Sequence, residues 1–229
     1  WAYRPENGRL VIYENQPGDF YGLRSGLESI PQKKAWELPL FTGIIAAINV
    51  IVFVVLECMG STESATFIAE HGGMYPDFVL EEGEWWRILT AMFLHFGAAH
   101  LLNNMVIFCC VGSRLERAVG YIRFLVIYFL SGIGGGLLSL FMMVHTGDYT
   151  VSAGASGAIF GVIGGFLWAV IRHRGRLEGV TARGMMLMIA LSLYYGFSTI
   201  GIDNWCHVGG IITGFVVSVI LYHGKCQKD

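Results

Sequence analysis

The feature that most constrains this chain is a series of six apolar segments separated by short polar stretches. A helix needs about 20 apolar residues to cross the hydrocarbon core of a bilayer, which is about 30 Å thick. The segments therefore predict an all-α, polytopic membrane protein built as a bundle of six transmembrane helices. They occupy approximately residues 38–58, 100–113, 121–145, 156–171, 184–202 and 206–222, and the second, fourth and sixth are expected to be short.

The composition agrees with a membrane protein and argues against several other classes. Hydrophobic residues make up 54% of the 229 residues and charged residues only 14%, while glycine, which is common in membrane helices, occurs 31 times. The net charge of -2 gives no reason to expect a nucleic-acid partner. The five cysteines form no Cys-x-x-Cys pair, so we expect no disulfide framework. We also expect no metal and no cofactor.

The distribution of basic residues predicts how the segments are oriented. With six crossings, every lysine and arginine except Arg87 falls on one side of the membrane, and the loops on the other side carry acidic residues such as Asp148 and Asp203. By the positive-inside rule, the basic side is cytoplasmic. We therefore predict a multi-pass protein of the cell membrane with both termini in the cytoplasm.

A serine and a histidine occupy matching positions in the fourth and sixth segments. Ser156 stands in a Gly-Ala-Ser-Gly motif at the start of one segment, and His207 stands at the start of the other. Ser156 precedes Arg172 by sixteen residues and His207 precedes His223 by sixteen, which is about 24 Å of helix in each case. Both side chains should therefore lie at similar depth, slightly below the extracytoplasmic surface. A serine nucleophile and a histidine base for cutting peptide bonds within the bilayer fit this arrangement.

Glycines indicate that these two segments approach each other closely. Gly157, Gly161 and Gly165 recur every four residues in the fourth segment, and Gly210 and Gly214 do the same in the sixth. Small residues at this spacing allow helix backbones to come together in lipid. The short serine side chain needs such an approach to reach the histidine.

The second segment adds two hydrogen-bond donors. His100 and Asn104 are four residues apart and so share one helix face. Donors aimed at a developing oxyanion are what acyl transfer requires. A structural hydrogen-bonding pair is the alternative interpretation.

With these residues in place, the sequence resembles the rhomboid family of intramembrane serine proteases over roughly residues 38–222. Five motifs carry the resemblance, in the family's order and at its spacing. They are the GxSG motif at Gly154, Ser156 and Gly157, the HxxGxxxG helix at His207, Gly210 and Gly214, the HxxxN motif at His100 and Asn104, the tryptophan–arginine pair of the first external loop at Trp86 and Arg87, and the ExxxG motif at Glu116 and Gly120.

The resemblance implies a role for each of these positions. Ser156 would be the nucleophile and His207 the general base, forming a dyad without an acidic third member. The backbone N–H of Ser156 and the side chains of His100 and Asn104 would form the oxyanion hole. Phe160 occupies the position from which family members stack an aromatic ring on the histidine, although it lacks a hydroxyl for a hydrogen bond. Gly154, Gly157, Gly210 and Gly214 would support the site.

The resemblance also implies substrates, a route and a domain organisation. The substrates would be transmembrane segments of single-pass membrane proteins, which would reach an active site open to the extracytoplasmic side. The fifth segment would act as a lateral gate, with Tyr194, Tyr195 and Phe197 wedged against the second segment. Residues 38–223 would form the protease domain and residues 224–229 a cytoplasmic tail. Outside the region of resemblance, we expect residues 1–37 to be a cytoplasmic segment, either the end of a small domain or a linker, with a strand at 9–13 and a turn at 16–19.

Other functions fit the residues less well. An intramembrane metalloprotease needs an HExxH motif, and the sequence contains no His-Glu pair. Every lysine lies in a predicted cytoplasmic stretch, which argues against a serine–lysine dyad. An aspartyl protease would need two intramembrane carboxylates, whereas Asp148 and Asp203 both lie in predicted outer loops. Two alternatives from other classes are a non-catalytic rhomboid-like protein that binds membrane clients and a transporter. The first usually lacks the serine or the histidine, and the second needs a polar path through segments whose inner halves are apolar here.

Overall fold

The computed structural model describes residues 2–6, 9–13, 39–199 and 201–224. The chain divides into two units, Trp1–Leu38 and Pro39–Asp229. In the first unit, strands β1 (Ala2–Glu6) and β2 (Arg9–Tyr13) pair in antiparallel register. The strand predicted at residues 9–13 is therefore present. The turn predicted at 16–19 and nearly all of the tail predicted at 224–229 lie outside the described residues.

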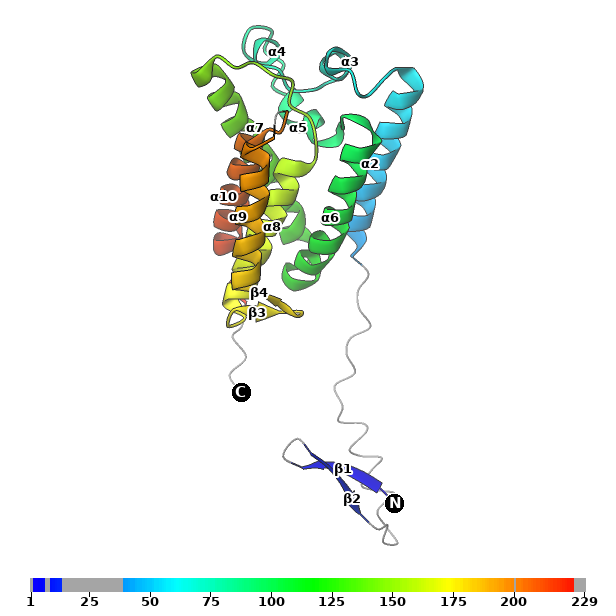
Figure 1. Ribbon diagram of the computed structural model, residues 1–229, viewed down its shortest axis with the longest axis vertical. Coiled ribbons are helices and arrows are strands. Elements are labelled where there is room, and N and C mark those ends of the chain that lie inside the picture. Colours follow the sequence, from blue (N-terminus) through cyan, green and yellow to red (C-terminus); the bar gives the residue numbers. More distant parts are fainter. Residues whose placement is uncertain (1, 7–8, 14–38, 200, 225–229) are drawn as a thin grey trace. The chain divides into compact units, whose positions relative to one another are not determined.

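Within the described residues, six long helices make up the second unit (Figure 1). They are α2 (Leu40–Met59), α6 (Gly97–Val119), α7 (Tyr121–Thr146), α8 (Ser156–Arg172), α9 (Ala182–Phe197) and α10 (Asn204–Leu221). Helices α2, α6, α7 and α10 are long and apolar enough to cross a membrane, and α8 and α9 are shorter apolar helices. The fold is thus the all-α membrane bundle that the apolar segments predicted.

The lengths of three helices differ from the prediction. Helix α6 has 23 residues and α10 has 18, so the second and sixth segments are not short, whereas the fifth, α9, has only 16. Helix α6 extends beyond its apolar run because its charged last turns remain helical until Gly120, whose φ of +84° ends the helix. Helix α9 stops before the predicted end at residue 202, and Gly201 with a φ of +87° lies in the connection to α10. An apolar run therefore locates a helix but does not fix its ends.

The two ends of the bundle carry different connections (Figure 1). At one end, the chain between α2 and α6 folds into the short helices α3 (Ala65–Glu70), α4 (Pro76–Leu80), α5 (Arg87–Thr90) and η1 (Ala91–Phe93). At the other end, strands β3 (Arg176–Leu177) and β4 (Val180–Thr181) form a hairpin that precedes α9. The folded α2–α6 connection touches the chain just before α8, because Met74 and Ser152 exchange two backbone hydrogen bonds of 2.9 and 2.8 Å.

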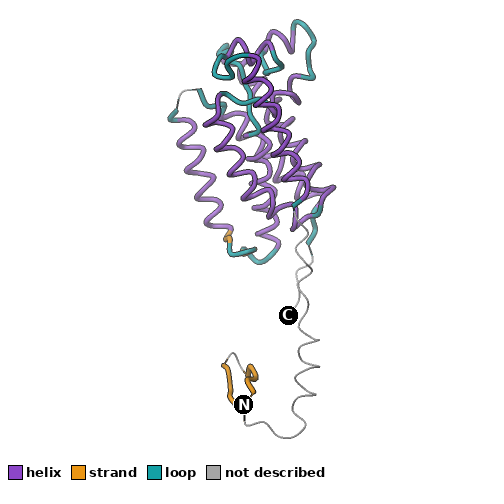
Figure 2. Tube along the Cα trace, turned by 90° about the vertical axis from the view of Figure 1, so that its right-hand side faces the viewer, coloured by secondary structure: helices purple, strands orange, loops and turns teal. Residues whose placement is uncertain are grey.

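Helix α8 lies at the centre of the bundle. It packs against α10, α7, α6 and α9, and Figure 2 shows the long helices of the bundle running in a similar direction. Its side chains Ile159, Val162 and Phe166 are buried in the main hydrophobic core. A helix surrounded by other helices does not need to be long, because its neighbours, rather than lipid, cover its surface. The N-terminus of α8 is consequently enclosed by other parts of the protein.

A buried glutamate joins α6 to the start of α2. The carboxylate of Glu116 accepts hydrogen bonds of 2.8 Å from the backbone N–H groups of Phe41 and Thr42, and one of 2.6 Å from the Thr42 hydroxyl. The first N–H groups of a helix have no partner within the helix, and Pro39 at the cap position of α2 supplies none from its side chain. Glu116 therefore replaces the missing cap and fixes α2 on α6.

Helix α9 is the most peripheral helix of the bundle. The only buried residues of this helix are Met185 and Gly196, and Tyr194, Tyr195 and Phe197 are between 56% and 74% exposed. The expectation that these aromatic residues wedge against α6 is therefore wrong. The fifth segment is held instead at Gly196, where an added methyl group would overlap the side chain of Asn204 at the start of α10.

Candidate active site

Ser156 is the first residue of α8 and lies at the end of α8 that faces the folded α2–α6 connection. The two residues before it, Gly154 and Ala155, are each held by a hydrogen bond. The N–H of Gly154 donates to the carbonyl of Ala91 over 2.9 Å, and the N–H of Ala155 donates to Nε2 of His95 over 3.4 Å. Gly154 has a φ of +139°, a backbone conformation that side chains disfavour, which explains why glycine stands there. The serine is thus presented by a loop of defined conformation.

His207 lies in the first turn of α10, beside Ser156. Its Nε2 is 2.9 Å from the Ser156 Oγ, which is hydrogen-bonding distance. The ring of Phe160, one turn further along α8, stacks on the imidazole with centroids 4.2 Å apart and planes inclined by 17°. The other ring nitrogen, Nδ1, is buried and has no hydrogen-bond partner among the described residues. Among the described residues, no carboxylate forms a hydrogen bond with the imidazole of His207.

The glycines of α8 and α10 make this distance possible. A methyl group on Gly210 would overlap the carbonyl oxygen of Gly157, and one on Gly214 would overlap that of Gly161. The two helices are therefore in backbone-to-backbone contact along the stretch that follows the serine and the histidine. The close approach predicted from the glycine spacing is present.

His100 and Asn104 lie on α6, with His100 near the serine. The Phe96 N–H donates to Nδ1 of His100 over 3.3 Å, so the ring proton of a neutral His100 belongs on Nε2. A methyl group on Gly154 would lie 3.1 Å from that Nε2 and 3.7 Å from the Ser156 Oγ. Glycine therefore keeps open a space that both atoms border. Asn104 is buried, and its Nδ2 has no hydrogen-bond partner among the described residues.

Two residues near the site carry contacts that sequence analysis did not anticipate. His95 accepts the Ala155 N–H, and burial, with a smaller contribution from nearby His100, lowers the pKa of His95 to about 3. A neutral imidazole is what such an acceptor requires. Asp203, which the sequence placed in an acidic loop, accepts hydrogen bonds from Ser139 and Ser152 instead. Both contacts join residues that are far apart in the sequence, so the sequence alone does not reveal them.

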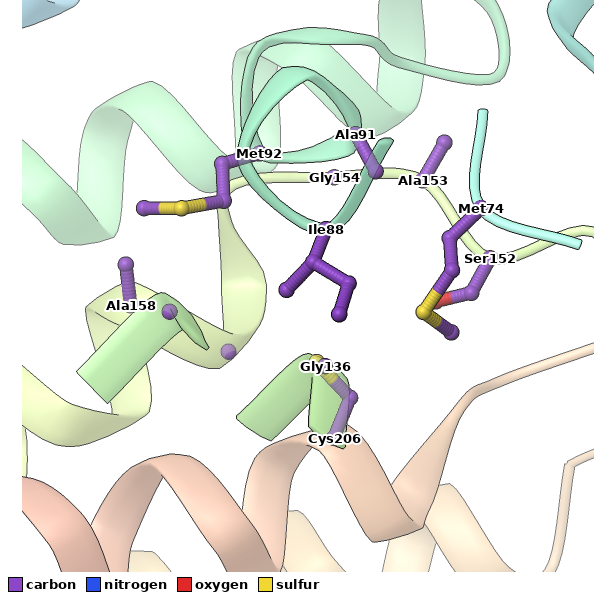
Figure 3. A pocket seen from close by; sticks show the side chains of 12 residues that line it. Met74, Ile88, Ala91, Met92, Gly136, Ser152, Ala153, Gly154, Ala158 and Cys206 are labelled. Carbon is purple, nitrogen blue, oxygen red and sulfur yellow. The ribbon is translucent and has the colours of Figure 1, made fainter. Parts of the chain in front are cut away.

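A cavity of about 20 Å³ lies behind the loop that carries the serine (Figure 3). The residues that line it include Gly154, Gly157, Met92, Ser152 and Cys206. This volume is about that needed for one water molecule. Cys206, the residue before His207 in α10, also lines this cavity.

The described residues contain no group of three or more histidine, cysteine, aspartate or glutamate side chains that could hold a metal ion. The site combines a hydroxyl and an imidazole at hydrogen-bonding distance, and α6 carries two side chains, His100 and Asn104, that can donate hydrogen bonds.

Comparisons with known proteins identify relatives of this chain. The model of the Rhomboid domain matches residues 82–224. The chain is 37% identical over 184 residues to the rhomboid protease GluP of Bacillus subtilis (strain 168), an alignment that covers 80% of this chain and 35% of that protein. It is 36% identical over 156 residues to RHOMBOID-like protein 4 of Arabidopsis thaliana, covering 66% of this chain and 37% of the relative.

A shorter bacterial relative is matched over most of its length. The putative rhomboid protease YdcA of Bacillus subtilis (strain 168) is 34% identical over 146 residues, which cover 64% of this chain and 72% of that protein. This chain spans only about a third of GluP and of RHOMBOID-like protein 4. The fold and the site define a polytopic helical membrane protein that brings a serine and a histidine together inside its bundle. The chain belongs to the rhomboid family.

Proposed function

We propose that this chain is an intramembrane serine endopeptidase that cleaves transmembrane segments of single-pass membrane proteins within the lipid bilayer. The observation that carries the proposal is the 2.9 Å separation of Ser156 Oγ and His207 Nε2 inside a helical membrane bundle. Membership of the rhomboid family supports it, since relatives such as GluP are named rhomboid proteases.

In the proposed reaction, Ser156 and His207 act as a dyad. The imidazole takes the proton of the serine hydroxyl as the oxygen attacks the carbonyl carbon of the scissile peptide bond. The same nitrogen then gives the proton to the leaving amine, and a water molecule hydrolyses the acyl-enzyme with His207 again as the base. Phe160 holds the ring from one face, and this contact takes over part of the orienting role that an acidic residue has in a triad.

The proposed oxyanion hole has three donors. They are the backbone N–H of Ser156, Nε2–H of His100 and Nδ2–H of Asn104. The space beside Gly154 is bordered by His100 and by the serine oxygen, and the amide of Asn104 is buried without a partner. An unpaired buried donor costs about 1–3 kcal/mol. A bond that it makes only in the transition state contributes directly to catalysis.

The proposed location is the cell membrane, with both termini in the cytoplasm and the active site open toward the extracytoplasmic side. The basic residues at the hairpin end of the bundle and the acidic residues at the serine end support this orientation. Fusing a reporter that is active only in the cytoplasm to the C-terminus tests it. An inactive C-terminal fusion on a correctly inserted protein would contradict the orientation.

Substrate access is proposed to occur between α6 and α9. Helix α9 supports this route because Met185 and Gly196 are its only buried residues, so displacing it disturbs little of the core. A disulfide that joins the outer ends of α6 and α9 should block cleavage of a transmembrane substrate and leave hydrolysis of a small soluble ester unchanged. Normal cleavage of the transmembrane substrate by the cross-linked protein would rule this route out.

The proposed function is tested with purified protein in liposomes that also contain a single-pass substrate. The parent should release two fragments cut within or near the transmembrane segment, and Ser156→Ala and His207→Ala should release none while retaining the parental helix content. The rate should also fall as the pH drops through the pKa of His207, since the imidazole must be neutral to accept a proton. Parental cleavage by Ser156→Ala would exclude a serine mechanism.

A further inference from the structure

The carboxylate of Asp203 joins three separate segments of the bundle. Asp203 is the N-cap residue of α10, and its Oδ1 accepts the N–H of Cys206 over 3.0 Å. Its Oδ2 accepts the hydroxyl of Ser139 in α7 over 2.5 Å and the hydroxyl of Ser152 over 2.6 Å. Ser152 lies in the loop that leads from α7 into the nucleophile. One side chain thus fixes the start of α10 to a neighbouring helix and to the serine-bearing loop.

The positions of these contacts relate Asp203 to both members of the dyad. Ser152 lies four residues before Ser156, and Asp203 lies four residues before His207. Ser152 is itself held, because its backbone forms two hydrogen bonds with Met74. Ser139 is 1% exposed in α7 and so cannot shift without disturbing the core. The carboxylate therefore connects two chain segments, each four residues before a reacting side chain.

Asp203 does not act by touching the imidazole. Both of its oxygens are occupied by Cys206, Ser139 and Ser152, and Nδ1 of His207 has no hydrogen-bond partner among the described residues. Helix capping alone does not account for the arrangement either. Capping uses one oxygen, whereas the second oxygen of Asp203 accepts two hydroxyl groups from outside α10.

We infer that Asp203 is a positioning residue for the dyad, which holds the start of α10 and the nucleophile loop in register so that His207 meets Ser156 at bonding distance. The inference rests on the proposed serine-protease function. Its physical basis is the steep dependence of rate on geometry, since a displacement of about 1 Å can lower a rate by about a hundredfold. The glycine contact of α8 and α10 sets how close the helices come, and the Asp203 contacts set the register of their first turns.

The test compares Asp203→Ala and Asp203→Asn with the parent in liposomes, measuring kcat and KM for a single-pass substrate and the rate at which a fluorophosphonate labels Ser156. We expect Asp203→Ala to lower kcat and the labelling rate by about tenfold to a hundredfold, with KM within about twofold of the parental value. Asp203→Asn should retain most of both rates. Its amide oxygen can still accept the Cys206 N–H, and the two serine hydroxyls can turn to accept from the amide nitrogen.

Two further variants separate positioning from a general loss of stability. Replacing both Ser139 and Ser152 by alanine leaves the cap intact and removes only the contacts to α7 and the loop, so it should slow both rates in the same way. Combining this change with Asp203→Ala should add little, because one shared carboxylate carries the effect. Ser64→Ala is the matched control, since Ser64 caps α3 by accepting the Phe67 N–H and should leave both rates unchanged.

The outcomes distinguish this inference from the function on which it rests. A parent that neither cleaves substrate nor labels at Ser156 would refute the proposed function itself. An active parent with parental kcat and labelling in Asp203→Ala would overturn the positioning role. Parental rates in the Ser139 and Ser152 double variant would also overturn it, and this result remains decisive if Asp203→Ala does not fold. An Asp203→Asn variant as slow as Asp203→Ala would assign the effect to charge rather than to positioning.

Discussion

The rings of Phe160 and His207 are stacked, with their centroids 4.2 Å apart and their planes inclined by 17°. Aromatic pairs of this kind contribute about 0.5–1.5 kcal/mol beyond the area that they bury. The contact matters more here because Nδ1 of His207 has no hydrogen-bond partner among the described residues to fix the ring. The face of Phe160 is therefore the main restraint that the structure provides on the imidazole plane.

Replacing Phe160 by leucine should lower kcat about twofold to tenfold, since leucine fills similar space but offers no aromatic face. Phe160→Tyr is the matched control and should stay near the parental rate because it keeps the ring. Steady-state cleavage of a single-pass substrate measures both variants. A parental kcat in Phe160→Leu would show that the stacking does not orient the base.

Replacing Gly210 by alanine should abolish most of the activity and destabilise the protein. The added methyl group would overlap the Gly157 carbonyl oxygen, and such overpacking typically costs about 1–3 kcal/mol. The two helices must move apart, which lengthens the Ser156–His207 distance. Gly43→Ala in α2 is the control because nothing lies within 4 Å of the added group. Thermal unfolding and cleavage rates measure the effect, and equal behaviour of the two variants would contradict the packing argument.

Replacing Asn104 by alanine should lower kcat at least tenfold with little change in KM, because the proposed bond forms mainly in the transition state. Loss of one oxyanion donor typically costs about 2.7–4 kcal/mol, and the donors from His100 and the Ser156 backbone would compensate in part. Asn103→Ala offers a close comparison, since this neighbouring asparagine is exposed and should tolerate the change. An unchanged kcat in Asn104→Ala would remove this residue from the oxyanion hole.

The stability of the protein should depend on pH through His95. Burial lowers the pKa of His95 to about 3 from its ordinary 6.5. Between these values the unfolded chain binds a proton that the folded protein excludes. The stabilisation is therefore complete above about pH 6.5 and is lost as the pH falls toward 3.

His95→Gln keeps an acceptor for the Ala155 N–H without this titration. Its unfolding temperature should fall less than that of the parent between pH 7.5 and pH 4.5. His145→Gln, at an exposed position of α7, serves as the control and should keep the parental dependence. An unfolding temperature that falls equally in parent and His95→Gln would show that His95 does not carry the effect.

Much of the site could be predicted from sequence because its determinants are local or periodic. Ser156 and His207 each stand at the start of an apolar segment, and the four-residue spacings of Gly157 with Gly161 and of Gly210 with Gly214 indicate which helices approach. The ends of α6 could not be predicted, because charged residues interrupt the apolar pattern while the helix continues to Val119.

The contacts of Asp203, His95 and the aromatic residues of α9 could not be predicted either. A sequence shows that Asp203 precedes a helix, as an N-cap residue does, but not that Ser139 and Ser152 donate to it. The aromatic residues near the end of α9 are compatible with either a buried or a lipid-facing position. Only the packing of α9 on its neighbours shows that Tyr194 and Tyr195 are exposed.

In the proposed dyad, the reactivity of Ser156 depends on His207. The most direct measurement is the rate of fluorophosphonate labelling of the purified protein, with the modified residue located by mass spectrometry. We predict that the parent is labelled at Ser156, that Ser156→Ala is not labelled, and that His207→Ala is labelled at least a hundredfold more slowly while remaining folded. Labelling of Ser156→Ala at the parental rate, or parental labelling of Ser156 in folded His207→Ala, would contradict the proposed dyad.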